Sequence, residues 1–484
     1  MKYFKIVLPL LIATLSSAQE PFAELSIKKS KYGGRVIENV FTVVNDEDKT
    51  FAIFTDDNKG FQSSLMNFEG GEITTFSSER PPKRYDEIIG YNVEGNDVTL
   101  FLKNRKNNKF GSIHFDFDYQ TAREELYDFK LKDEIYLKGY NHGSLFYLIT
   151  LTKKSNDLNF YVYQGQNQIQ KTTVEVFDEK FKSKSGKILN LHEVLSQQPN
   201  SDFIRTSSFL NLIQIDDSAP NSIENVSAKA KIYSKENGFV LSIENRSFTH
   251  LFNFLLPELT YTTSTYGKPE INSEFSNSNS FVFENNIYLI NASAEEMKFS
   301  VLDVETKEII KETHLKKDEE IPFKNTPIIQ EGGGLNKYRE MEKSTKLLRR
   351  LTKEDIGIAV NKIDEDHIIT IGSKKMISTG GAPMMMPGFG AIPIGAVGGL
   401  TVAFNPTFFA YNSYTRTKST RIKCLFDKDF NHLEGIVPDN TFDRIKKAAD
   451  AIRSKKAETI FKLEDSFIWG YFNKTSKVYS FYRF

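Results

Sequence analysis

A β-propeller of about seven or eight four-stranded blades, with two inserted or flanking amphipathic helices, is the fold that this sequence predicts. Three observations predict it: a strand pattern that recurs about every 47 residues, short polar turns between successive strands, and 40 Phe and 21 Tyr against one Trp. Phe and Tyr favour strands and pair across them. Four short antiparallel strands in a repeat of this length are typical of one propeller blade. Tandem β-sandwiches are the alternative, because they too consist of short strands and turns.

The start of the chain predicts export. Lys2 and Lys5 precede a short apolar run, and Ser16 and Ala18 are small residues that a signal peptidase accepts. The run is shorter than the roughly 20 residues that span a bilayer. We therefore expect residues 1–18 to be a signal peptide and residues 19–484 to be a single exported domain, periplasmic, at the outer surface or secreted, with no transmembrane span.

Charge and cysteine content narrow the class of protein. The 63 Lys and Arg residues balance 63 Asp and Glu residues, which argues against nucleic acid as the partner. Cys424 is the one cysteine, so no disulfide can form within the chain. An exported chain of this length can still be stabilised by burial alone.

The repeated strand begins at Thr50, Asp97, Ser144, Gly238 and Asn286, in steps of 47, 47, 94 and 48 residues. The double step leaves room for a degenerate unit within 186–222. The ring has eight blades if this unit is a blade and seven if it is not. The other units that we expect in this part of the chain are 40–77, 88–129, 134–178, 226–266 and 280–315.

Two further units are expected near the C-terminus. One opens with strands at Ile356 and His367 and closes with STRIKCLFD and FNHLEGIV. The last strands, ETIFKLE, SFIWGYFN and KVYSFYRF, need a fourth partner. The segment FAELSIKK, near the mature N-terminus, can supply that partner and close the ring.

Three segments depart from the repeat. Residues 335–353 and 439–457 keep helical spacing of apolar residues, and Asp439 or Asn440 can cap the second helix. Residues 376–415 form a charge-free Gly/Met/Pro insertion, whose prolines rule out a transmembrane helix. It either packs over apolar surface or docks on a partner or lipid. Its three consecutive methionines have no neighbouring Cys or His, so we expect no metal and no cofactor.

Strand parity places these departures on one face. In a blade whose chain runs up and down, the loops after the second and fourth strands emerge on the same side. Both helices, the insertion and the links at Arg80–Arg84 and Lys180–Lys187 fall in such loops and make that face basic, whereas the opposite turns are short and often acidic. The residues that we expect to contact a partner there are Arg80, Lys83, Arg84, Lys346, Arg349, Arg350, Met384, Met385, Met386, Phe389, Lys446 and Lys447.

No catalytic motif stands out in the sequence. It contains no GxSxG elbow, HExxH pair, phosphate-binding loop or dinucleotide fingerprint. We therefore expect a non-catalytic exported propeller that binds a protein or an anionic envelope component, with peripheral membrane contact allowed. The alternative is a secreted glycan-active hydrolase, in which carboxylates from several blades converge at the channel mouth.

Overall fold

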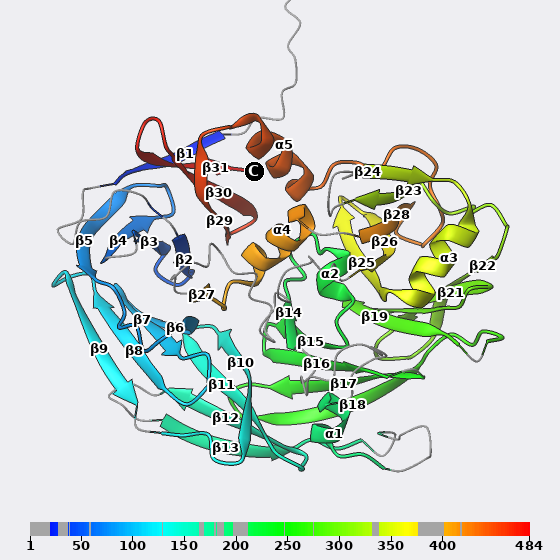
Figure 1. The fold of residues 1–484 in the computed structure, drawn as a ribbon, viewed down its shortest axis with the longest axis horizontal. Helices are drawn as coiled ribbons and strands as arrows, with labels where there is room; N and C mark the ends of the chain where they lie inside the picture. Colours follow the sequence, from blue (N-terminus) through cyan, green and yellow to red (C-terminus); the bar gives the residue numbers. More distant parts are fainter. Residues whose placement is uncertain are drawn as a thin grey trace, which may run out of the picture.

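The computed structural model confirms the propeller. In the part of the chain that it describes, seven β-sheets surround a central axis (Figure 1). It describes residues 20–27, 37, 39–57, 60–127, 129–163, 169–178, 181, 188–196, 212–245, 247–273, 275–331, 338–375, 401–416 and 419–484. No helix in these ranges is long and apolar enough to cross a membrane.

Blades 1 to 3 are antiparallel meanders that run in chain order from the innermost strand outwards. Blade 1 consists of β2 (Asn39–Asn45), β3 (Thr50–Asp56), β4 (Gly60–Asn67) and β5 (Glu72–Glu79). Blade 2 consists of β6 (Glu87–Glu94), β7 (Asp97–Lys103), β8 (Phe110–Asp116) and β9 (Thr121–Tyr127). Blade 3 consists of β10 (Glu134–His142), β11 (Leu145–Thr152), β12 (Asp157–Tyr163) and β13 (Ile169–Glu175).

Blades 4 and 5 follow the same plan. Blade 4 consists of β15 (Ala230–Lys235), β16 (Gly238–Glu244), β17 (Phe248–Leu255) and β18 (Thr260–Gly267). Blade 5 consists of β19 (Asn277–Phe283), β20 (Asn286–Ala292), β21 (Glu296–Asp303) and β22 (Ile309–Lys316). The described residues of 186–222 form no blade of their own: they contribute α1 (Leu191–Ser196) and β14 (Leu212–Ile215), which adds to blade 4 in parallel with β15. The described part of the ring therefore has seven blades rather than eight.

Blade 6 departs from the predicted strand order. Its inner strands are β25 (Asp355–Ile363) and β26 (Asp366–Lys374), followed outwards by β28 (Ser419–Phe426). The fourth strand is β23 (Ile328–Glu331), which precedes the blade in the chain and pairs with both β28 and β24 (Tyr338–Met341). The segment FNHLEGIV forms only an isolated bridge between Phe426 and His432, so its prediction as the closing strand is wrong.

The two predicted helices are present but shorter. α3 (Ser344–Lys353) buries Leu347, Leu348 and Leu351; the residues before it that were predicted to be helical include β24, which pairs with β23 instead. α5 (Thr441–Ala451) begins at the predicted cap, where the side chains of Asn440 and Asp443 bond to each other's backbone N–H. It ends before β29, which takes the residues beyond Ala451 that were expected to extend the helix.

Blade 7 closes the ring as predicted. Its chain-terminal strands are β29 (Lys455–Leu463), β30 (Ser466–Asn473) and β31 (Val478–Arg483). The fourth is β1 (Glu20–Ser26), which pairs antiparallel with β31. The first and the last strand of the described chain are thus neighbours in one sheet (Figure 1). Their pairing closes the ring.

The last part of the charge-free insertion lies near the axis of the ring (Figure 1). β27 (Thr401–Val402) pairs in parallel with β6, and α4 (Pro406–Arg416) packs beside the innermost strand of blade 7. Phe404 contacts the rings of Phe41 and Tyr91, with centroids 6.0 and 5.1 Å away. This part of the insertion covers apolar surface, which is one of the two roles expected for it; residues 376–400 lie outside the described residues.

Aromatic side chains fill the spaces between blades. Phe101 of blade 2 stacks on Phe146 of blade 3 with ring centroids 4.2 Å apart. The innermost strands of these blades approach so closely that a Cβ on Gly139 would lie 2.1 Å from the carbonyl oxygen of Ile89. This contact requires glycine, because any side chain there would push the two blades apart.

Candidate functional face

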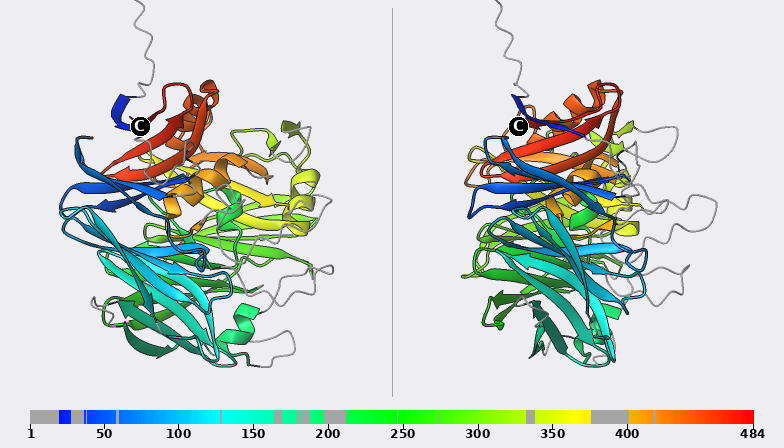
Figure 2. Two further views of the ribbon diagram at one scale, coloured as in Figure 1. Left: turned by 60° about the vertical axis from the view of Figure 1, so that its left-hand side comes forward. Right: turned by 90° about the vertical axis from the view of Figure 1, so that its left-hand side faces the viewer.

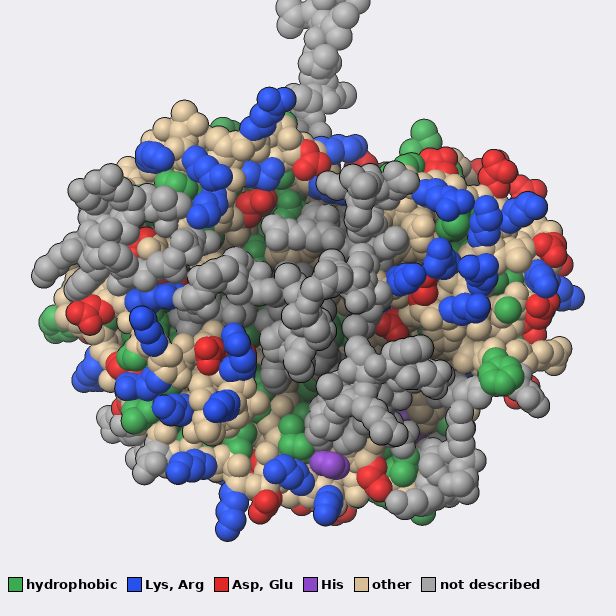
Figure 3. Space-filling view, viewed as in Figure 1, with side chains coloured by type: hydrophobic (Ala, Val, Ile, Leu, Met, Phe, Trp, Pro, Cys, Tyr) green, Lys and Arg blue, Asp and Glu red, His purple; other side chains and the backbone are tan. Residues whose placement is uncertain are grey.

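One face of the ring carries α3, α5 and most links between blades. The loops that follow second strands and fourth strands emerge on one side of the ring, which Figure 2 shows from its edge. The view down the axis shows Lys and Arg side chains spread across this face (Figure 3). We call it the basic face. The turns after first and third strands emerge on the opposite face.

Five of the eight predicted basic residues already have acidic partners. Arg80 bonds to the buried carboxylate of Asp56 at 3.0 Å, and Arg350 bonds to Glu354 at 2.6 Å. The other three pairs are Arg84 with Glu124, Lys446 with Glu331, and Lys447 with Asp439. These five side chains join neighbouring elements, so they are less available to a partner than their sequence positions indicate.

Glu331 shows how such pairing works. Its carboxylate oxygens lie 2.6 Å from Arg421 and 3.2 Å from Lys446, which connects blade 6 to α5. Burial opposes ionisation of this carboxyl, but the two cations outweigh it and hold the pKa of Glu331 below its usual value. Lys446 therefore joins α5 to blade 6, which makes it less available to a partner.

The other three predicted basic residues, Lys83, Lys346 and Arg349, are exposed. No carboxylate in the described ranges lies within ion-pair distance of their side chains. Lys346 and Arg349 project from α3 together with exposed Lys343, whereas the buried leucines of the helix face blade 6. These residues remain as candidate contacts.

The sequence interpretation missed a second set of exposed cations on the same face. They occupy the turns after the second strands of blades 2 and 3 and the link between those blades. We call them, with Lys83, the basic rim: Lys83, Arg105, Lys106, Lys109, Lys130, Lys132, Lys153 and Lys154. Strand parity predicts their place, because the segments NRKNNK and KKSN also follow second strands.

Several acidic residues of this face are buried at strand ends. Glu244, at the end of β16, is fully buried between Lys231 at 3.1 Å and Lys268 at 2.5 Å. Ser280 of blade 5 also donates to it, at 2.5 Å. Burial opposes its ionisation, yet the two lysines hold the pKa of Glu244 well below its usual value, while burial lowers the pKa of Lys268 to about 8. Burial also lowers the pKa of Lys231, against which the carboxylate of Glu244 acts.

The same arrangement recurs in other blades. An acidic residue at a strand end on this face is paired inside the blade or with the adjoining link. Besides Glu244, the examples are Asp56 with Arg80, Glu87 with Lys103, Glu296 with His314, and Glu354 with Arg350. These five carboxylates are thus paired within the fold and are not presented to a partner.

The opposite face has the reverse sign. Its turns include Asp46 to Asp48, Asp364 to Asp366 and the start of β7. At β7, ligand atoms of Asp97, His114 and Asp116 lie within 4.8 Å of one another, the one such group of three found in the described residues. It comes from the second and third strands of one blade and lies away from the axis, so it is not the convergence of several blades that a glycan-active channel mouth would require.

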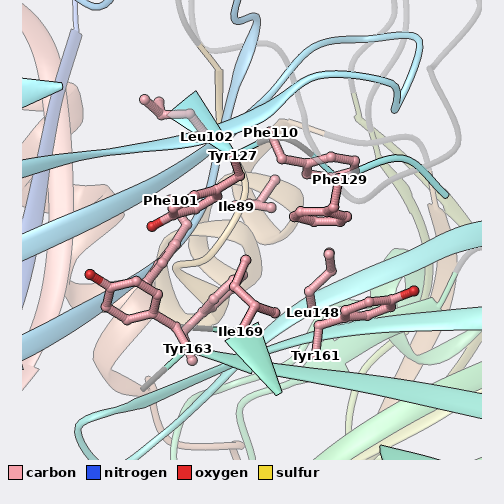
Figure 4. Close-up of a pocket in the computed structure, with 12 residues that line it drawn as sticks. Ile89, Phe101, Leu102, Phe110, Tyr127, Phe129, Leu148, Tyr161, Tyr163 and Ile169 are labelled. Carbon is pink, nitrogen blue, oxygen red and sulfur yellow. The ribbon is translucent and has the colours of Figure 1, made fainter. Parts of the chain in front are cut away.

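A small apolar crevice lies between blades 2 and 3 (Figure 4). Phe101, Phe129, Tyr161 and Tyr163 are among the rings around it, and no charged side chain lines it. The hydroxyl of Tyr127 donates to Ser112 at 2.7 Å. We read the crevice as part of the aromatic packing between these blades.

Four of the predicted contacts lie outside the described residues: Met384, Met385, Met386 and Phe389. Most of the link Lys180–Lys187 also lies outside them. The structure therefore neither places these predicted contacts on the basic face nor removes them from it.

Comparisons with known proteins add little beyond the fold. No protein-family model matches the chain, and no curated protein sequence matches it. A solved structure described as the Dos1 propeller is 8% identical over 96% of this chain and 94% of that chain, with a TM-score of 0.26. A prolyl endopeptidase structure is 7% identical over 91% of this chain and 55% of that chain, with a TM-score of 0.31.

A functionally unknown protein from Desulfotomaculum acetoxidans is 12% identical over 58% of this chain and 72% of that chain, with a TM-score of 0.25. Similarity at these levels concerns architecture alone. The assignment of a seven-bladed β-propeller rests on the sheet topology of the chain itself.

Proposed function

We propose that the mature chain is an exported, non-catalytic propeller that binds an anionic macromolecular partner through its basic face. The partner is an acidic protein or the anionic headgroups of an envelope surface. The observation that carries this proposal is the basic rim, where exposed cations gather, while acids at several strand ends of the same face are paired inside the blades.

The physical reason is the separation of charge within a chain of zero formal net charge. A general attraction to polyanions is weak in such a chain, but a local field on one face steers an anionic partner to that face. Each exposed Lys or Arg contributes about 1 kcal/mol near an anionic surface, so several must act together.

The proposal is tested by reversing charge on one face at a time. Replacing Arg105, Lys106 and Lys109 by Glu should weaken binding to phosphatidylglycerol-containing vesicles about 100-fold, because three contacts of about 1 kcal/mol are removed or reversed. The same variant should lose protein partners captured by crosslinking in cells.

The matched control makes the same change of net charge on the opposite face. It replaces by Glu the residues Lys49, Lys307 and Lys428, which are exposed in the turns after the first strand of blade 1 and after the third strands of blades 5 and 6. We expect this variant to bind like the parent protein. Equal loss of binding in both variants, or loss in neither, would show that the basic face has no special role.

A further inference from the structure

The outermost strand of blade 4 differs from the outermost strands of the other blades. β18 reads TYTTSTYG; it contains no charged residue and no proline, and it pairs with β17 over eight residues without a break in register. Every other outermost strand in the described part of the ring carries charge. Those strands are β1, β5, β9, β13, β22 and β24.

This difference bears on association. An outermost strand leaves a row of backbone N–H and C=O groups that can pair with another chain, and proteins block such edges with charges, prolines or bulges. β1 has Pro21 and a break in register, and β5 and β22 also have breaks in register. β18 has none of these, and Thr and Tyr are residues that favour strands.

β18 is also held firmly in place. The hydroxyl of Tyr261 donates to the carbonyl of Glu175 at 2.9 Å, and that of Tyr266 donates to the carbonyl of Val304 at 2.6 Å. Neighbouring segments therefore anchor the strand from both of its faces. Thr260, Thr262 and Thr263 remain exposed, and in the described ranges no strand pairs with the outer edge. A strand fixed in its extended form loses little entropy when it gains a partner.

We propose that β18 pairs antiparallel with β18 of a second copy of this chain across a two-fold axis. Self-pairing centred near Thr263 sets Thr and Ser opposite Thr and Ser, which are favourable cross-strand pairs. It also sets Tyr261 opposite Thr265, and Tyr266 opposite Thr260, of the other copy, which are pairs of an aromatic with a β-branched side chain.

Self-pairing is specific to this edge. The same operation on β9 would place Glu124 opposite Glu124 of the other copy, and like charges directly opposite are destabilising. An isologous contact of this kind closes after two copies and forms no filament. The sequence of β18 matches its own antiparallel copy, which favours a second copy over a strand of an unrelated protein as the occupant.

Sedimentation velocity on residues 19–484 tests the proposal. Between about 1 and 100 µM the chain should pass from monomer to dimer, and added salt should not weaken the dimer, because β18 carries no charge. Thr263→Lys should weaken dimerisation at least tenfold, since the two introduced ammonium groups face each other near the axis. Ala122→Lys, at an exposed position on β9, is the control and should leave dimerisation unchanged.

Disulfide trapping gives a second readout that does not depend on a weakened variant. Cys424 is fully buried, so a cysteine introduced at Thr263 is the one that oxidation would crosslink, and it should yield a covalent dimer. Ala122→Cys should not. A monomer at the highest concentration, a dimer insensitive to Thr263→Lys, or capture of another protein's strand by the cysteine at 263 would each overturn the proposal. None of these results depends on binding by the basic face.

Discussion

At the scale of single residues, charge on this ring is decided by contacts between strands far apart in sequence. Glu244 ends a strand that reads as apolar. Its partners are Lys231 in β15, Lys268 directly after β18 and Ser280 in β19. Sequence patterns predicted which face carries the basic residues. They did not predict which of these residues form internal ion pairs, because that depends on how the blades contact one another. Arg350 and Lys446 were therefore predicted as partner contacts, although the fold uses them in internal ion pairs.

The buried group around Glu244 yields a stability prediction. Glu244→Gln leaves Lys231 and Lys268 buried without their carboxylate, which should lower the free energy of unfolding by about 3–5 kcal/mol. Denaturant unfolding at pH 7 measures this. Glu295→Gln is the control: it breaks an exposed ion pair with Lys317 and should cost less than about 1 kcal/mol. Equal stability of Glu244→Gln and the parent would contradict the account.

The same group makes stability depend on pH. The pKa of Glu244 is lower in the folded chain than in the unfolded chain, so its contribution is fully present above about pH 4.3, the ordinary value. It is lost as pH falls further, because the unfolded chain then binds the proton first. Between about pH 5 and 3, unfolding curves of Glu244→Gln should change less with pH than those of the parent.

At the scale of elements, the repeat in the sequence was sufficient to place most strands and the closing strand. Period and turn chemistry are local signals, so blades 1 to 5 and the β1–β31 pairing were predictable. The fourth strand of blade 6 was not, because β23 precedes the blade and joins it through pairing with β28. β14 and β27 were missed for a similar reason: each adds in parallel to an inner strand from outside the repeat.

Ring closure can be tested at Leu25, which points from β1 into a fully buried cluster with Phe461 and Tyr479 of blade 7. Leu25→Ala should lower the free energy of unfolding by about 2–5 kcal/mol, since it removes buried apolar surface and leaves a cavity. Glu24→Ala, next to it and exposed, is the control.

Deleting Lys477–Phe484 should lower the melting temperature far more, because β1 loses its partner. A full melting temperature after that deletion would show that closure does not stabilise the ring.

At the scale of the whole molecule, a zero formal charge conceals two faces of opposite sign. Strand parity predicted the sign of each face. Figure 3 shows the basic face, where the described residues keep a positive sign with different members. The turns after the second strands of blades 2 and 3 supply more exposed cations than the link Arg80–Arg84, from which the basic face was predicted. Blade number, helix ends and the buried ion pairs needed three-dimensional information, because each depends on which blade a segment joins.

Lysine footprinting tests the central claim, that the basic face is where an anionic partner docks. The parent protein is acetylated with and without phosphatidylglycerol vesicles, and modification is quantified by mass spectrometry at each lysine. The account predicts slower modification of Lys106, Lys109 and Lys346 when vesicles are present, with Lys307 and Lys428 on the opposite face unchanged. Protection that is equal on both faces, greater on the opposite face or absent from both would contradict it.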